Sequence, residues 1–309
     1  MKYFFAPVQG HTDAAYRHFH QKTYGNENLI YTTPFIRLER GGIRQKDLKD
    51  LFSHLNENII LKPQIIFRNE EEFKSLIDLL KEKNVSSIDL NMGCPFPLQT
   101  GHGRGAATVS NEKLVHYVVE TINENPDINF SVKIRLGLND PNEWKVLLPI
   151  LNQSKIEYLT VHPRVAKQQY TGELYMNEFA EIYNESKNPI IYNGDLTKPE
   201  DVFAIKENFP EIAGIMIGRG ALGRPSIFNE IISGEEWDKE KRLSKMLEFH
   251  RELYNYYYTV LQGETQILSK IKPFWEYAEE EIGRKTWKQI KKSISVPKYN
   301  TALGLIKSN

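Results

Sequence analysis

This 309-residue sequence has almost no cysteine, because Cys94 is the only one. A single thiol excludes an intramolecular disulfide framework and indicates a reducing compartment. Long apolar runs are also missing, since no stretch approaches the ~20 apolar residues that a membrane span needs. The apolar run between Met1 and Pro7 is too short for a signal peptide. We therefore expect a cytoplasmic protein with no membrane segment.

Net charge is absent as well, because 40 Lys and Arg residues balance 40 Asp and Glu residues. The basic total that many nucleic-acid-binding domains have is therefore missing. The distribution is uneven, however, since no acidic residue follows Arg284. Such a basic stretch is either a solvated helix face or a contact surface for phosphate backbones. Its first cationic residues are Arg284, Lys285, Lys288, Lys291 and Lys292.

Metal and nucleotide motifs are missing too. There is no H-x-x-x-H or H-E-x-x-H pattern, one cysteine cannot build a thiolate zinc site, and there is no Walker A sequence. We therefore expect no metal site. The run from Gly218 to Gly223 spells G-x-G-x-x-G, but it follows the last predicted strand. A Rossmann fingerprint belongs at the first strand of a βαβ unit, so we reject that fold.

Short β-rich runs alternate with helical patterns along most of the chain. Eight such runs separated by helices predict parallel pairing and a (β/α)8 TIM barrel over residues 1–233. Residues 234–309 show helical patterns without a strand and predict a small C-terminal helical domain with an aromatic core. The predicted strands cover residues 3–8, 29–35, 63–67, 85–91, 130–136, 157–161, 189–192 and 213–217.

The carboxyl ends of barrel strands carry the active site, and here nearly all of them are polar or glycine. The only thiol stands at one such end, in Asn91-Met92-Gly93-Cys94-Pro95. A lone cysteine is usually a small buried apolar residue. Gly93 and Pro95 predict a sharp turn that aims the thiol out of the strand end, which favours a reaction centre. The glycine-rich run after it, residues 101–105, predicts a flexible loop.

Other strand ends carry groups suited to an anionic ligand. Lys133 and Arg135 share parity in an apolar strand, and an inward lysine is costly to bury unless it is paired. Lys133 therefore faces a ligand or a carboxylate, either as a Schiff-base lysine or as a cation beside a reduced flavin. His162 ends the sixth strand, where ligand contact is favoured over a purely structural hydrogen bond. The loops after the last two strands match the phosphate site of such barrels, although tight turns alone are the alternative.

Together these stretches resemble the tRNA-dihydrouridine synthase family. The resemblance runs in order through residues 3–228, and the helical tail matches only in kind. The chain departs from the family pattern at Val8, Pro163 and residues 96–99. The matching stretches are residues 6–13, 63–65, 88–95, 101–106, 132–137, 161–164, 193–195 and 216–222.

The resemblance implies an FMN-dependent enzyme that uses NADPH to reduce a specific uridine of tRNA to 5,6-dihydrouridine. It implies hydride transfer from flavin N5 to uracil C6, with Cys94 protonating C5. An unperturbed thiol is mostly protonated at neutral pH, which suits a proton donor. The implied FMN contacts are Pro7, Val8, Gln9, Gln64, Lys133 and His162, with the phosphate at Asn193, Gly194, Asp195, Gly218 and Arg219. We expect tRNA contacts at Asn91, Arg104, Arg135, Arg284, Lys285, Lys288, Lys291 and Lys292, and we expect a monomer.

Two other functions stay open. The first is a flavin-dependent barrel dehydrogenase that acts on a free pyrimidine or another small molecule, as dihydroorotate and dihydropyrimidine dehydrogenases do. Such an enzyme does not need the basic helical tail. The second is an RNA-binding scaffold without chemistry, which would bind tRNA but no flavin.

Overall fold

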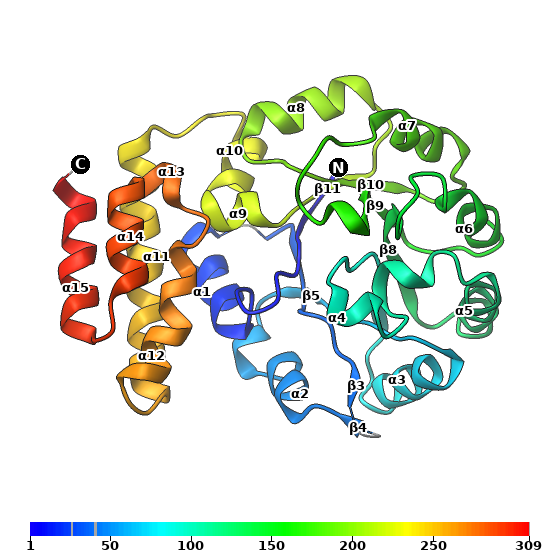
Figure 1. The fold of residues 1–309 in the computed structure, drawn as a ribbon, viewed down its shortest axis with the longest axis horizontal. Coiled ribbons are helices and arrows are strands. Elements are labelled where there is room, and N and C mark those ends of the chain that lie inside the picture. Colours follow the sequence, from blue (N-terminus) through cyan, green and yellow to red (C-terminus); the bar gives the residue numbers. More distant parts are fainter. Residues whose placement is uncertain (26, 40–41, 309) are drawn as a thin grey trace.

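The computed structural model describes residues 1–25, 27–39 and 42–308 (Figure 1). In this part of the chain, nine parallel strands form one sheet in the order β5-β2-β1-β11-β10-β9-β8-β7-β6. The two end strands, β5 and β6, are consecutive in sequence and separated only by Pro63. They are two halves of one barrel strand, so the sheet closes with eight strand positions and the predicted TIM barrel is confirmed. The strands are β1 (Lys2–Phe5), β2 (Leu29–Thr32), β5 (Ile60–Lys62), β6 (Gln64–Ile65), β7 (Ser87–Met92), β8 (Asn129–Gly137), β9 (Leu159–Val165), β10 (Ile190–Asn193) and β11 (Gly214–Ile217).

Pro63 divides the third barrel strand because proline has no N–H to donate to a neighbouring strand. The half before it pairs with β2, and the half after it pairs with β7. The sequence pattern predicted only the second half of this strand. It also missed a small antiparallel pair, β3 (Leu38–Glu39) with β4 (Gly42–Ile43), which stands at the edge of the barrel mouth.

Helices surround the strands as the alternating pattern predicted (Figure 1). Three of them begin at a side chain that accepts a hydrogen bond from a backbone N–H of the first turn, namely Asp13, Asn69 and Asn111. The helices of the barrel are α1 (Ala14–Tyr24), α2 (Gln45–Leu51), α3 (Glu70–Glu82), α4 (Pro97–Thr100), α5 (Glu112–Glu124), α6 (Trp144–Leu151), α7 (Met176–Glu185), α8 (Pro199–Asn208), α9 (Arg219–Gly223) and α10 (Ile227–Ser233).

The strand alternation separates two environments. On β7, Ile88, Leu90 and Met92 face outward and pack under the helices, whereas Asp89 and Asn91 face the barrel interior. One side of that interior is apolar, and its cluster comprises Phe4, Ala6, Tyr158, Ile191 and Met216. The opposite side is polar, because the pairing register sets Gln64, Asp89 and Ser131 beside one another. The polar side lies beneath the strand ends that carry the predicted site.

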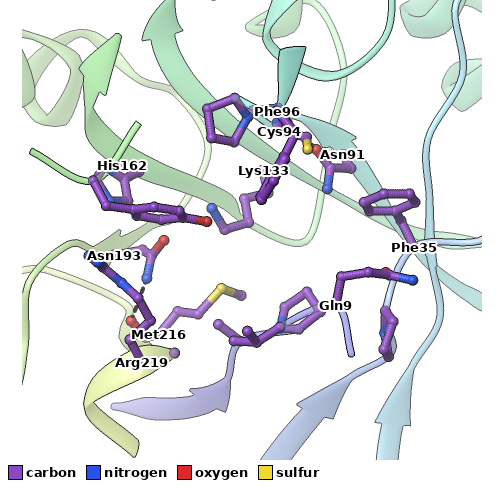
Figure 2. A pocket seen from close by; sticks show the side chains of 18 of the residues that line it. Gln9, Phe35, Asn91, Cys94, Phe96, Lys133, His162, Asn193, Met216 and Arg219 are labelled. Atoms are coloured by element: carbon purple, nitrogen blue, oxygen red, sulfur yellow. Dashed lines mark hydrogen bonds between the residues drawn. The ribbon is translucent and has the colours of Figure 1, made fainter. Parts of the chain in front are cut away.

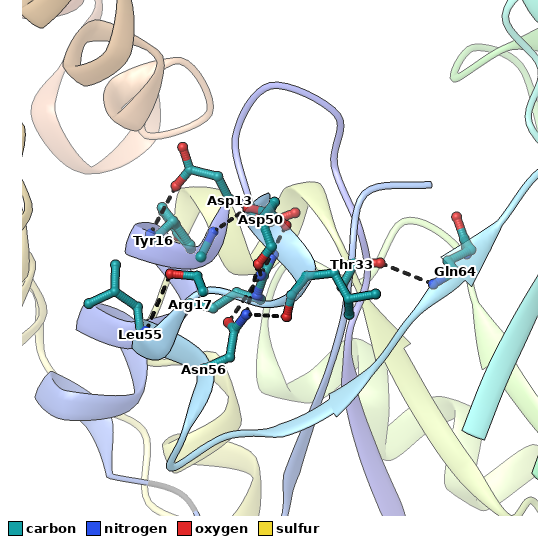
Figure 3. Close-up of polar contacts among 12 residues, drawn as sticks. Asp13, Tyr16, Arg17, Thr33, Asp50, Leu55, Asn56 and Gln64 are labelled. Carbon is teal, nitrogen blue, oxygen red and sulfur yellow. Dashed lines mark hydrogen bonds and ion pairs between the residues drawn. The ribbon is translucent and has the colours of Figure 1, made fainter. Parts of the chain in front are cut away.

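A buried arginine ties the first helix to α2 and to the segment that follows it (Figure 3). Arg17 donates to the Thr12 carbonyl at 2.7 Å, to Asp50 Oδ2 at 3.0 Å and to Asn56 Oδ1 at 3.1 Å. Figure 3 also shows the backbone N–H of Gln64 donating to Thr33 Oγ1, at 3.0 Å. This bond fixes the strand directly after the break at Pro63.

The C-terminal helices stand beside α1, at one side of the barrel (yellow to red in Figure 1). Buried aromatic residues such as Phe249, Tyr257, Phe274 and Trp275 belong to the hydrophobic cluster that the barrel helices also form. The aromatic runs are therefore mostly core, as predicted, although Tyr258 is exposed. No helix in the described ranges is long and apolar enough to cross a membrane. The helices are α11 (Lys239–Val260), α12 (Glu264–Ile271), α13 (Glu279–Ile282), α14 (Arg284–Lys292) and α15 (Val296–Gly304).

Candidate active site

A cavity of about 590 Å³ opens at the carboxyl ends of the barrel strands (Figure 2). Its wall combines apolar residues with a few polar groups, as ligand sites usually do. Every FMN contact that the family resemblance implied lies in this wall, together with Cys94. The predicted site residues that line it are Pro7, Val8, Gln9, Gln64, Asn91, Cys94, Lys133, Arg135, His162, Asn193, Gly194, Asp195, Gly218 and Arg219.

The backbone of Cys94 is held at both of its polar groups. Its N–H donates to Asn91 Oδ1 at 2.9 Å, and its carbonyl accepts from the Ala106 N–H at 3.1 Å. Gly105 has φ +61°, and a Cβ there would lie 2.7 Å from the Cβ of Cys94. A Cβ on Gly93 would lie 2.7 Å from the carbonyl carbon of Ile134. Close packing against β8 therefore requires glycine at position 93, whereas the sequence pattern predicts glycine there for a sharp turn.

The Cys94 thiol lies in a protonating environment. Burial raises its pKa, and this outweighs the backbone N–H of Phe96 and the cations of Lys133 and Arg135, which act in the opposite direction. The thiol is therefore neutral at physiological pH. This arrangement suits a proton donor better than a nucleophile, which needs a lowered pKa or an adjacent base.

Lys133 points into the middle of the cavity from β8 (Figure 2). Burial and the neighbouring charge of Arg135 lower its pKa to about 8, while Asp89 and Cys94 oppose this shift. Among the described residues, no carboxylate lies within ion-pair distance of its Nζ and no acceptor takes its hydrogen bond. An unpaired lysine in a half-buried position is costly. The cavity therefore offers a cation that an anionic or carbonyl-rich ligand would satisfy.

His162 also faces the cavity with an unsatisfied ring. Its buried Nδ1 has no hydrogen-bond partner within the described part of the chain. Burial and the cations of Arg135, Lys133, Arg164 and Arg219 hold its pKa well below the usual value, so the imidazole is neutral. A neutral imidazole can donate to a ligand through one ring nitrogen and accept through the other.

The loops after β10 and β11 meet at one edge of the cavity, as the phosphate-site prediction requires. Gly220 lies so close to the Leu196 carbonyl that a Cβ there would clash. Asp195, with φ +42°, pairs with Arg164 and, at 3.2 Å, with Arg219. The Asp195 carboxylate thus orients two guanidinium groups. The carboxylate itself would repel a phosphate, so the predicted phosphate contact at Asp195 would have to come from its backbone. The two arginines exceed the one carboxylate by one positive charge.

The structure adds cavity residues that the sequence did not indicate. Tyr170 lies under Arg219, with 4.0 Å between the guanidinium carbon and the ring centroid. Glu276 and Tyr277 reach the rim from the C-terminal region, and His11 Nε2 lies 3.3 Å from Glu276. A sequence signal existed for Tyr277, which belongs to an aromatic cluster, but that cluster predicts core packing equally well. Phe35, Arg37, Arg44 and Phe96 also line the cavity.

Six predicted tRNA contacts lie outside the cavity. Arg104 forms an ion pair with Glu72 at 2.6 Å, and both side chains are only about one-tenth exposed. The glycine-rich segment around it is anchored by this pair and by short helical turns, so the prediction of tRNA contact at Arg104 gains no support from the geometry. The other five are all exposed on α14, and they are Arg284, Lys285, Lys288, Lys291 and Lys292. No group of three or more metal-ligating side chains occurs among the residues whose positions are described.

Comparison with known proteins identifies the family. Residues 4–306 match the family described as dihydrouridine synthase. The chain belongs to the dihydrouridine synthase family. This match covers nearly the whole sequence, including the C-terminal helices, and confirms the resemblance seen in the strand-end motifs.

Relatives of this dihydrouridine synthase family member carry consistent names. A probable tRNA-dihydrouridine synthase of Treponema pallidum is 28% identical over 93% of this chain and 87% of that protein. The tRNA-dihydrouridine synthase B of Pseudomonas putida is 34% identical, but the match spans 48% of this chain and 44% of that protein. Morphinone reductase has a similar fold, with a TM-score of 0.52 and 10% identity over 77% of this chain and 87% of that chain.

Proposed function

We propose that this chain is an FMN-dependent tRNA-dihydrouridine synthase that uses NADPH to reduce a specific uridine of tRNA to 5,6-dihydrouridine. The observation that carries the proposal is that the protonated thiol of Cys94 and the unpaired Lys133 open into the same cavity. Family membership and the names of the relatives support it. We further propose that the enzyme is cytoplasmic and monomeric.

The cavity fits FMN in size and in its donor groups. Its volume of about 590 Å³ lies within the range of roughly 300–1,000 Å³ that is common for ligand sites. Lys133, His162 and Gln64 would hold the isoalloxazine ring together with Pro7, Val8 and Gln9. The phosphate would lie at the loops after β10 and β11, near Gly194, Gly218 and Arg219. When bound and reduced, FMN would supply the hydride for uracil C6.

The remaining chemistry belongs to residues of this chain. Cys94 would donate its proton to uracil C5, and the thiolate that remains would recover a proton from solvent before the next turnover. The raised pKa of Cys94 keeps the proton available at neutral pH. The ammonium of Lys133 would balance negative charge on its ligand, because an ion in a site with little water interacts strongly with its neighbours. Asn91 and Arg135 would contact the uracil beside Cys94.

The uridine of a folded tRNA must leave its stack to reach this cavity, at a cost of a few kcal/mol. We propose that residues 234–309 act as the tRNA-binding domain and offset this cost by phosphate contacts. The five exposed cations of α14 are the candidate contacts. Arg37 and Arg44 also line the cavity, but they add no net positive charge there, because Glu39 and Asp47 pair with them.

The test begins with the purified protein and its visible absorption spectrum. We expect the two bands of an oxidised flavin, release of FMN on denaturation, and bleaching by NADPH. Incubation with NADPH and tRNA should then form dihydrouridine, measured by mass spectrometry of nucleosides.

Cys94→Ala should keep the flavin and its reduction by NADPH while product falls by roughly 10²–10⁴-fold. A colourless protein that fails to bind added FMN would refute the flavin site, and undiminished product would refute the role of Cys94.

A further inference from the structure

A chain of hydrogen bonds leads from the barrel interior to the backbone of Cys94. The Ser131 hydroxyl donates to Asp89 Oδ1 at 2.5 Å, and Gln64 Nε2 donates to Asp89 Oδ2 at 2.7 Å. Asn91 Nδ2 donates to Gln64 Oε1 at 2.7 Å. Asn91 Oδ1 then accepts from the Cys94 N–H at 2.9 Å and from the Gly93 N–H at 3.2 Å.

The direction of this chain is set at Asp89. Only 1% of Asp89 is exposed, and both of its oxygens accept hydrogen bonds. Burial raises its pKa, but the donors on both oxygens and the cations of Lys62 and Lys133 favour the charged form. A carboxylate can only accept, so the NH2 group of Gln64 must face it. The Gln64 oxygen then faces Asn91, and the Asn91 oxygen faces the two peptide N–H groups.

A neutral amide at position 89 would not impose this direction. It could present its own NH2 group to Gln64, which would turn both following amides around. Asn91 would then direct its NH2 group at the Cys94 N–H, donor against donor, and both backbone bonds would be lost. The buried charge therefore fixes the direction of the hydrogen bonds, which a neutral isostere would leave open.

We propose that Asp89 is a positioning residue whose carboxylate, acting through Gln64 and Asn91, fixes the backbone at Cys94 and thereby aims its thiol into the cavity. Asp89 itself does not line the cavity, whereas Gln64, Asn91 and Cys94 do. The catalytic meaning of this aim rests on the proposed function, in which Cys94 donates a proton. The structural relation does not, since it can be measured without flavin or tRNA.

The thiol itself is the reporter, because Cys94 is the only cysteine. The experiment measures the rate at which iodoacetamide alkylates the folded, flavin-free, full-length protein, followed by mass spectrometry. We expect Asp89→Asn to change this rate by at least about fivefold, as the loss of one to two net hydrogen bonds would. The matched control is Ser131→Ala, which removes the other bond to the same carboxylate and leaves the amide chain intact. It should stay within about twofold of the wild type.

A double-mutant cycle tests whether Asp89 acts through Asn91. We expect Asn91→Ala alone to change the alkylation rate, and Asp89→Asn to add nothing in that background. Equal effects of Asp89→Asn in both backgrounds would overturn the proposal, as would an unchanged rate in the single variant or an equal effect of Ser131→Ala. If Asp89→Asn does not fold, Gln64→Met breaks the chain one link later and carries the same expectation. Absence of dihydrouridine synthesis by the wild type would refute the proposed function but leave these rates intact.

Discussion

A Cβ atom on Gly223 would lie 2.5 Å from the carbonyl oxygen of Tyr277. Gly223 ends α9, the helix that begins at Arg219 directly after β11, and Tyr277 lines the cavity from the C-terminal region. The contact therefore joins the last barrel loop to the C-terminal helices at the rim of the candidate active site. We therefore expect the position of Arg219 to depend on the position of those helices.

Replacing Gly223 by alanine should disturb both sides of this contact. Overpacking against backbone costs about 1–3 kcal/mol, because neither chain segment can yield as a side chain would. We expect a lower melting temperature together with several-fold weaker FMN binding, measured by thermal denaturation and by flavin titration. Gly304→Ala is the control, since nothing lies within 4 Å of a Cβ there. Equal stability of the two variants would contradict the coupling.

We expect Lys133 to lower the stability of the flavin-free protein and to raise its affinity for FMN. Its folded pKa of about 8 lies below the usual value of 10.5, so between these values the unfolded chain holds more protons than the folded chain. The stability of the flavin-free protein should therefore rise as pH increases from 8 to 10.5. Lys133→Met should remove this dependence, raise the melting temperature at pH 7, and weaken FMN binding roughly tenfold to a hundredfold.

The measurement for Lys133 is a pair of pH series, one of melting temperature without flavin and one of FMN affinity. Wild-type affinity should fall as pH rises through the Lys133 pKa, whereas the affinity of Lys133→Met should stay nearly flat. Lys206→Met on the exposed face of α8 is the matched control and should change neither series. If the methionine variant binds FMN as tightly as the wild type does, Lys133 has no role in FMN binding.

Much of the site could be predicted because it depends on local sequence and one topological rule. Polar residues at the ends of apolar strands, such as Lys133 and His162, converge wherever eight parallel strands close into a barrel. Contacts between segments that lie far apart in the chain have no such local sequence pattern. The Tyr277 backbone passes too close to Gly223 for a side chain to stand there, and nothing in the sequence near either residue indicates the other.

Arg104 illustrates the same limit. Its glycine-rich neighbourhood predicts a flexible loop, but its partner Glu72 lies 32 residues earlier, at the start of α3. The two residues meet through the packing of α3 beside the segment around Arg104, and sequence spacing alone does not predict that packing. The break at Pro63 was visible as a proline, yet only the closed sheet shows that both halves belong to one strand.

Arg104→Met should therefore act on folding and not on tRNA binding. Removing Arg104 leaves Glu72 with the half-exposed Arg68 as its remaining cation, so the cost should be at most about 3–5 kcal/mol, that of a broken buried ion pair. Arg68→Met removes the more exposed partner of the same Glu72 and should cost no more than about 1 kcal/mol. Urea denaturation measures both. A stable Arg104→Met protein with weakened tRNA binding would restore the original prediction of a tRNA contact.

The basic face of α14 is best tested by charge removal and not by truncation. Deleting residues 234–309 would expose the hydrophobic cluster shared with the barrel and remove Tyr277 from the cavity, so loss of activity would be uninformative. The triple variant Lys288→Gln, Lys291→Gln and Lys292→Gln changes only exposed side chains. We expect weaker tRNA binding and a salt dependence whose logarithmic slope falls by up to ~0.9 for each lost phosphate contact. FMN binding should not change.

The control removes three exposed lysines from the barrel, Lys187→Gln, Lys198→Gln and Lys206→Gln, with the same change in net charge. If both triple variants weaken tRNA binding equally, the effect comes from net charge, and α14 is then a solvated face with no specific role.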